Sequence, residues 1–73
     1  MNIKMLIGVN IREQRLKNGL SQNDLAFHSE LDRSYISDIE LGKSNPTIIT
    51  LHKISNALEI DIVLFFKIKK WKK

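Results

Sequence analysis

The chain has 73 residues, 42% of them hydrophobic, and a formal net charge of +4 at pH 7, which allows one compact domain with a small core. It has no cysteine for a disulfide or a zinc site, and no run of residues apolar enough for a signal peptide or a membrane helix, which predicts a cytoplasmic protein that does not span a membrane. The positive charge alone does not indicate a nucleic-acid partner, because residues 67–73 hold five of the twelve Lys and Arg residues and residues 1–61 are nearly neutral.

The first apolar residues recur at helical spacing. Ile7, Ile11 and Leu16 are separated by polar residues, which predicts a helix with these three side chains toward the core. We expect this helix to end at Asn18-Gly19, where glycine can take the left-handed conformation that stops a helix.

Two short helices are predicted next. Ser21 and Asp24 have the spacing of a capping box, which begins a second helix of about two turns carrying Leu25, Ala26 and Phe27. Asp32 can cap a third helix, which points Ile36 and Ile39 inward and ends at Gly42. Its outer face is polar and consists of Arg33, Ser34, Ser37 and Asp38.

A polar loop, residues 43–46, precedes a fourth predicted helix. Thr47 can cap this helix, and helical spacing outweighs the strand propensity of its isoleucines. The side chains expected to face the core are Ile48, Leu51, Ile54, Ala57 and Leu58.

After Asp61, which can cap a fifth helix, the apolar residues are too many for one helix face to bury. We therefore predict a homodimer interface formed by Ile62, Leu64, Phe65 and Phe66. The expected organisation is a domain over residues 1–66 with a C-terminal dimerisation helix, followed by a basic tail, residues 67–73. The tail has three open roles: a solvated end, a phosphate contact or a contact with anionic lipid.

The second and third predicted helices, joined by about four residues, form a pattern that is typical of a helix-turn-helix. The residues Leu20-Ser21-Gln22, Leu25-Ala26, Tyr35-Ile36-Ser37 and Ile39-Glu40, with Gly42 and Pro46, resemble the lambda-repressor-like family of phage repressors, Cro proteins and bacterial relatives over about residues 5–66. The run Asp32-Arg33-Ser34-Tyr35-Ile36-Ser37 is especially similar to the controller proteins of restriction-modification systems. The resemblance implies an all-α, compact five-helix domain with the helix-turn-helix at helices two and three.

The resemblance also implies which side chains meet double-stranded DNA. The third helix of the family reads bases, and the arginine fork fits guanine O6 and N7 together, so Arg33 is the first candidate. The residues predicted to read bases are Arg33, Ser34, Tyr35, Ser37 and Asp38. Those predicted to contact phosphates are Gln22, Lys43, Ser44, Asn45 and Thr47. Gln22 is expected to support a base-reading side chain as well. For each of these residues, an ordinary solvated or packing role is the alternative.

Two further positions follow from the resemblance. Arg15 and Glu40 match residues that form an ion pair between the first and third helices, which is a structural role. Glu30 departs from the family, which usually has glycine in this turn, and a left-handed glutamate costs about 1 kcal/mol.

The predicted function is sequence-specific DNA binding by a homodimeric transcriptional regulator that recognises an inverted repeat and acts at a promoter by blocking or touching RNA polymerase. The alternative is a protein-binding module of the same fold, such as an antitoxin or an antirepressor. A catalytic activity is not expected, because His28 and His52 are isolated from each other and no nucleophile and base have a meaningful spacing. No metal or cofactor is predicted.

Overall fold

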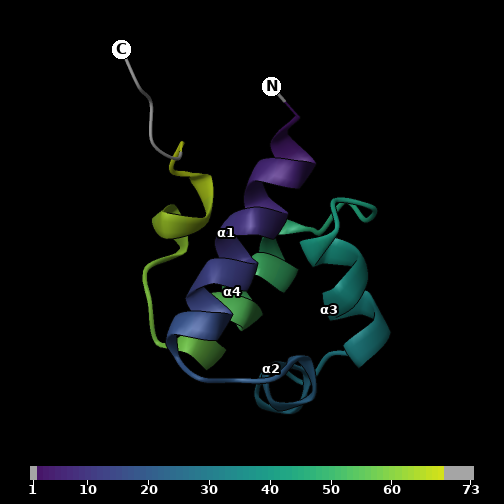
Figure 1. Cartoon of the computed structure of the whole chain (residues 1–73), viewed down its shortest axis with the longest axis vertical. Helices are drawn as coiled ribbons and strands as arrows, with labels where there is room; N and C mark the ends of the chain where they lie inside the picture. The colour runs from purple at the N-terminus through teal and green to yellow at the C-terminus, as the bar shows by residue number, and fades with distance from the viewer. Residues whose placement is uncertain (1, 69–73) are drawn as a thin grey trace.

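The computed structural model describes residues 2–68, which form four α-helices and one short 3-10 helix (Figure 1). The helices are α1 (Ile3–Lys17), α2 (Gln22–Ser29), α3 (Arg33–Glu40) and α4 (Ile48–Leu58), and the 3-10 helix is η1 (Ile62–Phe66). Helix α1 packs against α3 on one side and η1 on the other, and α2 packs against both α3 and α4. The described residues include no strand, so the predicted all-α class is confirmed.

A capping side chain sets the start of helix α1, and a glycine follows its end. The side chain of Asn2 caps its start by accepting from the backbone N–H groups of Lys4 and Met5. After its last residue, Gly19 has a φ of +69°, the left-handed conformation expected for it. Ile7 and Ile11 are buried as predicted, but Leu16 is 53% exposed. Arg15 is buried instead, one helical turn after Ile11 on the same face of α1.

A glycine in α1 brings two helices into direct backbone contact. A Cβ atom at Gly8 would collide with the carbonyl oxygens of Ile39 and Glu40, at the end of α3. The missing side chain thus lets the backbone of α1 lie against α3 without a spacer. This contact fixes the position of α3 on the rest of the domain.

The predicted caps of the later helices are mostly present. Ser21 and Asp24 form a complete capping box, in which the Ser21 backbone N–H and then its hydroxyl hold the pKa of Asp24 below its ordinary value. Thr47 caps α4 by accepting from the Thr50 backbone N–H. Asp32 occupies the cap position of α3, but its side chain makes no capping hydrogen bond.

The core is formed by one face of each helix. Besides Ile7 and Ile11, it contains Leu25, Ala26, Ile36, Ile39, Leu51, Ile54, Leu58 and Phe65. The expectation for Ile48 was wrong, because it lies in the first turn of α4 and is 63% exposed. The other predicted core residues of α4 are buried, apart from Ala57, which is half-buried.

The fifth predicted helix is instead the five-residue 3-10 helix η1. Asp61 does cap it, by accepting from the Val63 backbone N–H. The buried side chain of Asn10 donates to the carbonyls of Phe65 and Lys67, both at 2.9 Å. These are carbonyls that a continuing α-helix would use for its own hydrogen bonds, and Lys67 is already extended. Asn10 therefore holds the end of η1 against α1 and uses two carbonyls that a continuing helix would need.

The packing of η1 also corrects one residue of the predicted dimer interface. Phe65 has no exposed surface and belongs to the core of its own chain, so it is not available to a partner. Ile62 and Leu64 are half-buried, and Phe66 is 38% exposed. Residues 69–73 of the predicted basic tail lie outside the described residues.

Two glutamates adopt the left-handed conformation. Glu30, at the end of α2, has a φ of +60°, and Glu59, at the end of α4, has a φ of +56°. The first is the conformation that the family resemblance implied for this turn. Glycine takes this conformation without a Cβ penalty, and a carboxylate is unfavourable at the negative end of a helix.

We therefore expect Glu30→Gly to raise the free energy of unfolding by about 0.5–1 kcal/mol, with Glu59→Gly adding a similar amount. Urea unfolding monitored by circular dichroism measures both changes. The matched control is Glu13→Gly, in the interior of α1, which should lose stability because glycine there weakens the helix. A decrease for Glu30→Gly would show that the glutamate side chain stabilises the turn.

Candidate nucleic-acid interface

Helices α2 and α3 are joined by a three-residue turn. Glu30 is left-handed, and the backbone N–H of Leu31 donates to the carbonyl of Ala26 at 3.0 Å, so the turn closes the end of α2. Leu25 of α2 and Ile36 of α3 are fully buried and hold the two helices together. The opposite face of α3 is left to solvent.

Helix α3 carries all five residues predicted to read bases, and most of them lie on its solvent side. Arg33 and Ser34 open the helix and are exposed, as is Asp38 one turn later. Ser37 and Tyr35 are half-buried, and Tyr35 packs against the core. All five residues thus lie on one short helix, and Arg33, Ser34 and Asp38 are the exposed ones.

A buried ion pair ties α3 to α1. The Arg15 Nε donates to Glu40 Oε2 at 2.7 Å and its Nη2 to Glu40 Oε1 at 3.0 Å, while its Nη1 donates to the Leu20 carbonyl at 2.9 Å. The two side chains are only 8% and 2% exposed. The ion pair implied by the family resemblance is therefore present, as a bidentate contact at the end of α3.

Gln22 extends this ion pair to the exposed end of α3. Its Nε2 donates to Glu40 Oε1 at 3.1 Å, and its Oε1 accepts from Arg33 Nη1 at 3.2 Å. A continuous hydrogen-bonded series thus runs from Arg15 through Glu40 and Gln22 to Arg33. Gln22 therefore contacts Arg33, the side chain that it was predicted to support.

The loop after α3 carries the other predicted phosphate contacts. The Asp38 carbonyl accepts from the backbone N–H groups of Lys43 and Ser44, at 2.8 and 3.3 Å, which folds the loop onto the end of α3. Lys43 and Asn45 are exposed and Ser44 is half-buried. Thr47 is exposed, and its hydroxyl oxygen already accepts the capping hydrogen bond of α4.

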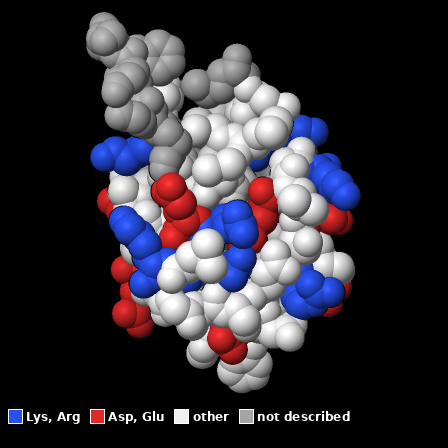
Figure 2. Space-filling model, viewed as in Figure 1, with Lys and Arg blue, Asp and Glu red and all other residues white. Residues whose placement is uncertain are grey.

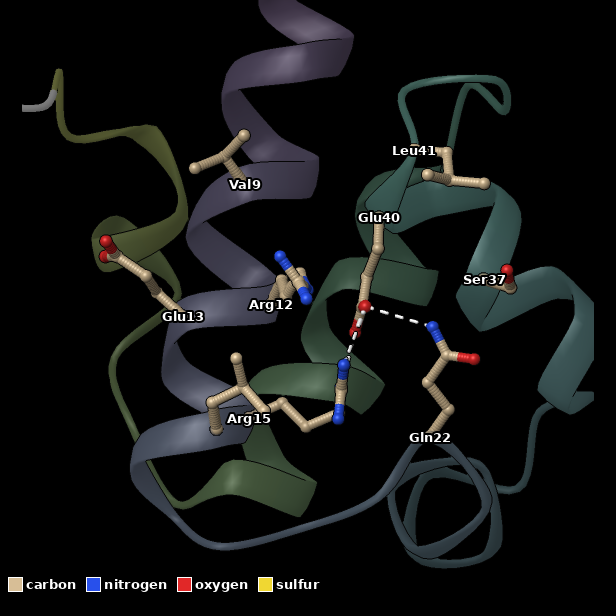
Figure 3. A pocket seen from close by; sticks show the side chains of 9 residues that line it. Val9, Arg12, Glu13, Arg15, Gln22, Ser37, Glu40 and Leu41 are labelled. Atoms are coloured by element: carbon tan, nitrogen blue, oxygen red, sulfur yellow. Dashed lines mark hydrogen bonds and ion pairs between the residues drawn. The ribbon is translucent and has the colours of Figure 1, made fainter.

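A hollow of about 590 Å³ lies between α1, α2 and α3 (Figure 3). Its floor is the Arg15–Glu40 ion pair, and Gln22 and Ser37 stand at its α2 and α3 edges. The α1 side includes Arg12, a residue that the sequence reasoning did not select. Arg12 follows Gly8 by one helical turn, so it lies on the side of α1 that faces α3.

Charge is mixed on the surface around this hollow. Figure 2 shows Lys and Arg side chains interspersed with Asp and Glu side chains on this face, with both signs meeting near the centre. No extended basic patch dominates the view. An interface here depends on the placement of individual cations rather than on the total charge.

The histidine and acidic side chains of residues 2–68 are dispersed over the fold. No three His, Asp or Glu residues there are grouped so that they could hold a metal ion. His28 lies against the ring of Phe27, and His52 contacts the Asn56 amide, so the two histidines belong to different helices and different surroundings. None of the helices in this range is long and apolar enough to cross a membrane.

Known proteins are similar to this chain in both sequence and fold. A family model described as helix-turn-helix matches residues 11–65. The control protein C.BamHI of Bacillus amyloliquefaciens is 47% identical over 60 residues, which are 81% of this chain and 74% of that protein. The restriction-modification controller protein C.AhdI of Aeromonas hydrophila has a crystal structure that superposes with a TM-score of 0.85 and 40% identity, covering 86% of this chain and 96% of that one.

A third relative has been solved on DNA. The restriction-modification controller protein C.Esp1396I, as a tetramer in complex with its natural 35 base-pair operator, has a TM-score of 0.82 and 41% identity, covering 90% of this chain and 87% of that one. Variants of the same protein with an arginine, a threonine or a tyrosine replaced, at three consecutive positions, have also been solved. Arg33, Ser34 and Tyr35 form a run of the same residue classes here.

Proposed function

Because this chain belongs to the helix-turn-helix family that includes the restriction-modification controller proteins, we propose that it is a transcriptional regulator that binds an inverted-repeat operator in double-stranded DNA as a homodimer. The observation that carries the proposal is the hydrogen-bonded series from Arg15 to Arg33, which holds a base-reading side chain at the exposed start of α3.

The geometry suits readout from the major groove. A helix the size of α3 fits this groove when its first residues face the base edges, and these residues are Arg33 and Ser34. Arg33 supplies two parallel N–H donors for the O6 and N7 atoms of guanine. Ser37, one turn later, is placed for a second contact, and Asp38 can accept from cytosine N4.

The residues proposed to contact the DNA backbone flank α3. Gln22 stands at the start of α2, where the first backbone N–H groups of the helix also point outward toward an anion. The loop residues Lys43 and Asn45 are exposed beyond the end of α3. Contacts of this kind position the protein on the duplex, whereas the side chains of α3 supply the sequence preference.

Exposed apolar side chains near η1 support a dimer. Val63 is 55% and Phe66 38% exposed, with Ile62 and Leu64 half-buried beside them. In the proposed dimer, we expect a two-fold axis through this segment to set the two copies of α3 about one DNA turn, or about 34 Å, apart. We assign residues 1–66 to the DNA-binding and dimerising domain. At a promoter, such a dimer acts in the cytoplasm either by blocking RNA polymerase or by contacting it.

Selection of bound duplexes from a random pool, at fixed salt, tests the proposal. The expected result is enrichment of an inverted repeat whose half-sites lie about 10 base pairs apart, centre to centre. Sedimentation at tens of micromolar tests the dimer separately. No enrichment by the wild type would contradict DNA readout and favour the protein-binding module, whereas an enriched single half-site would contradict only the dimer.

A further inference from the structure

Arg12 lies on α1, outside the helix-turn-helix, but faces it. Gly8 contacts the backbone end of α3, and Arg12 follows one helical turn later on the same side of α1. Figure 3 shows the Arg12 side chain on the side of α1 that faces α3, and it lines the same hollow as Gln22 and Ser37. The close contact at Gly8 therefore brings this cation to the edge of the base-reading helix.

The charge of Arg12 is available to a ligand. Arg15 already donates two hydrogen bonds to Glu40. Within residues 2–68, the Arg12 guanidinium forms no hydrogen bond or ion pair. Its neighbour Glu13 lines the outer part of the hollow, and Figure 3 shows its carboxylate pointing away from α3. Arg12 is thus the exposed cation of the hollow.

The course of a bound duplex leads past this position. When α3 lies in the major groove, the phosphate backbones of the two strands pass on either side of it. One side is the loop at Lys43 and Asn45. The other is the start of α2, where Gln22 stands at the mouth of the hollow. Gln22 and Arg12 line the same hollow, so a DNA strand that passes from Gln22 toward α1 comes within reach of Arg12.

We propose that Arg12 binds a DNA phosphate, so that α1 acts as a third backbone contact beside Gln22 and the loop after α3. The inference rests on the proposed function, because it requires α3 to lie in the major groove. It assigns a DNA-binding residue to the helix that otherwise only supports α3. The contact is to the backbone, so it adds affinity without altering the sequence preference.

The test compares Arg12→Gln with Lys17→Gln, an equal loss of charge at an exposed residue of α1 outside the hollow. Affinity for the selected operator and for a scrambled duplex of equal length is measured by fluorescence anisotropy at several salt concentrations. In a dimer, Arg12→Gln removes two phosphate contacts, so the slope of log K against log salt should fall by about 1.8. Affinity for both duplexes should fall about ten-fold or more near 0.1 M salt.

The controls separate the possible outcomes. Arg12→Lys should keep the wild-type slope, and the thermal unfolding of Arg12→Gln should match that of the wild type because the side chain is exposed. Equal slopes for Arg12→Gln and Lys17→Gln would overturn the inference while leaving the proposed function intact. A wild type that binds neither duplex would overturn both.

Discussion

Replacing Arg33 by alanine should relax the base preference at one position of each half-site and leave the free energy of unfolding nearly unchanged. The side chain is exposed, and its hydrogen bond to Gln22 at 3.2 Å lies on the surface, so its loss costs the fold little. The binding free energy that favours guanine over the other bases at this position should fall by about 1–3 kcal/mol, because the bidentate pair with Arg33 supplies that preference.

Selection from a random duplex pool by Arg33→Ala and by wild type, at the same salt, measures this effect. The control is Lys53→Ala, which removes one cation from an exposed position of α4, remote from α3 along the chain. An unchanged preference at every position in Arg33→Ala would remove Arg33 from the base-reading set. A uniform loss of affinity without relaxation would make it a phosphate contact.

The second prediction concerns folding. Arg15→Ala should lower the free energy of unfolding by about 3–5 kcal/mol, because it leaves the Glu40 carboxylate buried without its counter-ion. The Leu20 carbonyl also loses the donor that it has at 2.9 Å. For a domain of this size, such a loss removes a large part of the total stability. Loss of DNA binding should then follow from unfolding.

Urea unfolding of Arg15→Ala against Lys17→Ala, an exposed neighbour on the same helix, checks the magnitude. The double variant Arg15→Met with Glu40→Leu should recover part of the loss, since it removes both charges from the interior. If Arg15→Ala unfolded like the wild type and still lost DNA binding, Arg15 would be a DNA contact and not a structural residue.

The features predicted correctly from sequence are those set by local chemistry. The capping box at Ser21 and Asp24, the cap at Thr47 and the helix end at Gly19 each depend on a few neighbouring residues, so they can be read without a fold. The family resemblance added what spacing could not show. It brought Arg15 and Glu40 together, 25 residues apart along the chain.

The wrong predictions concern how elements pack. Helical spacing placed Leu16 and Ile48 toward the core, but the faces that α1 and α4 bury are decided by their neighbours. The prediction of a fifth α-helix was wrong, because this segment is a short 3-10 helix. Asn10, 55 residues away from Phe65, takes the Phe65 carbonyl that an extension of the helix would need. Arg12 was missed for the same reason, since its orientation toward α3 depends on the backbone contact at Gly8.

The hydrogen bonds from Asn10 also bear on how the protein is made. They join α1 to residues 55 and 57 positions later, and Phe65 completes the core at the same place. At ordinary translation rates of about 5–20 residues per second, α1 waits roughly 3–11 s for these partners to be synthesised. A helix forms in about a microsecond. During those seconds α1 lacks both the Asn10 hydrogen bonds and the Phe65 contact, so the last part of the core can close only after residues 65 and 67 have been made.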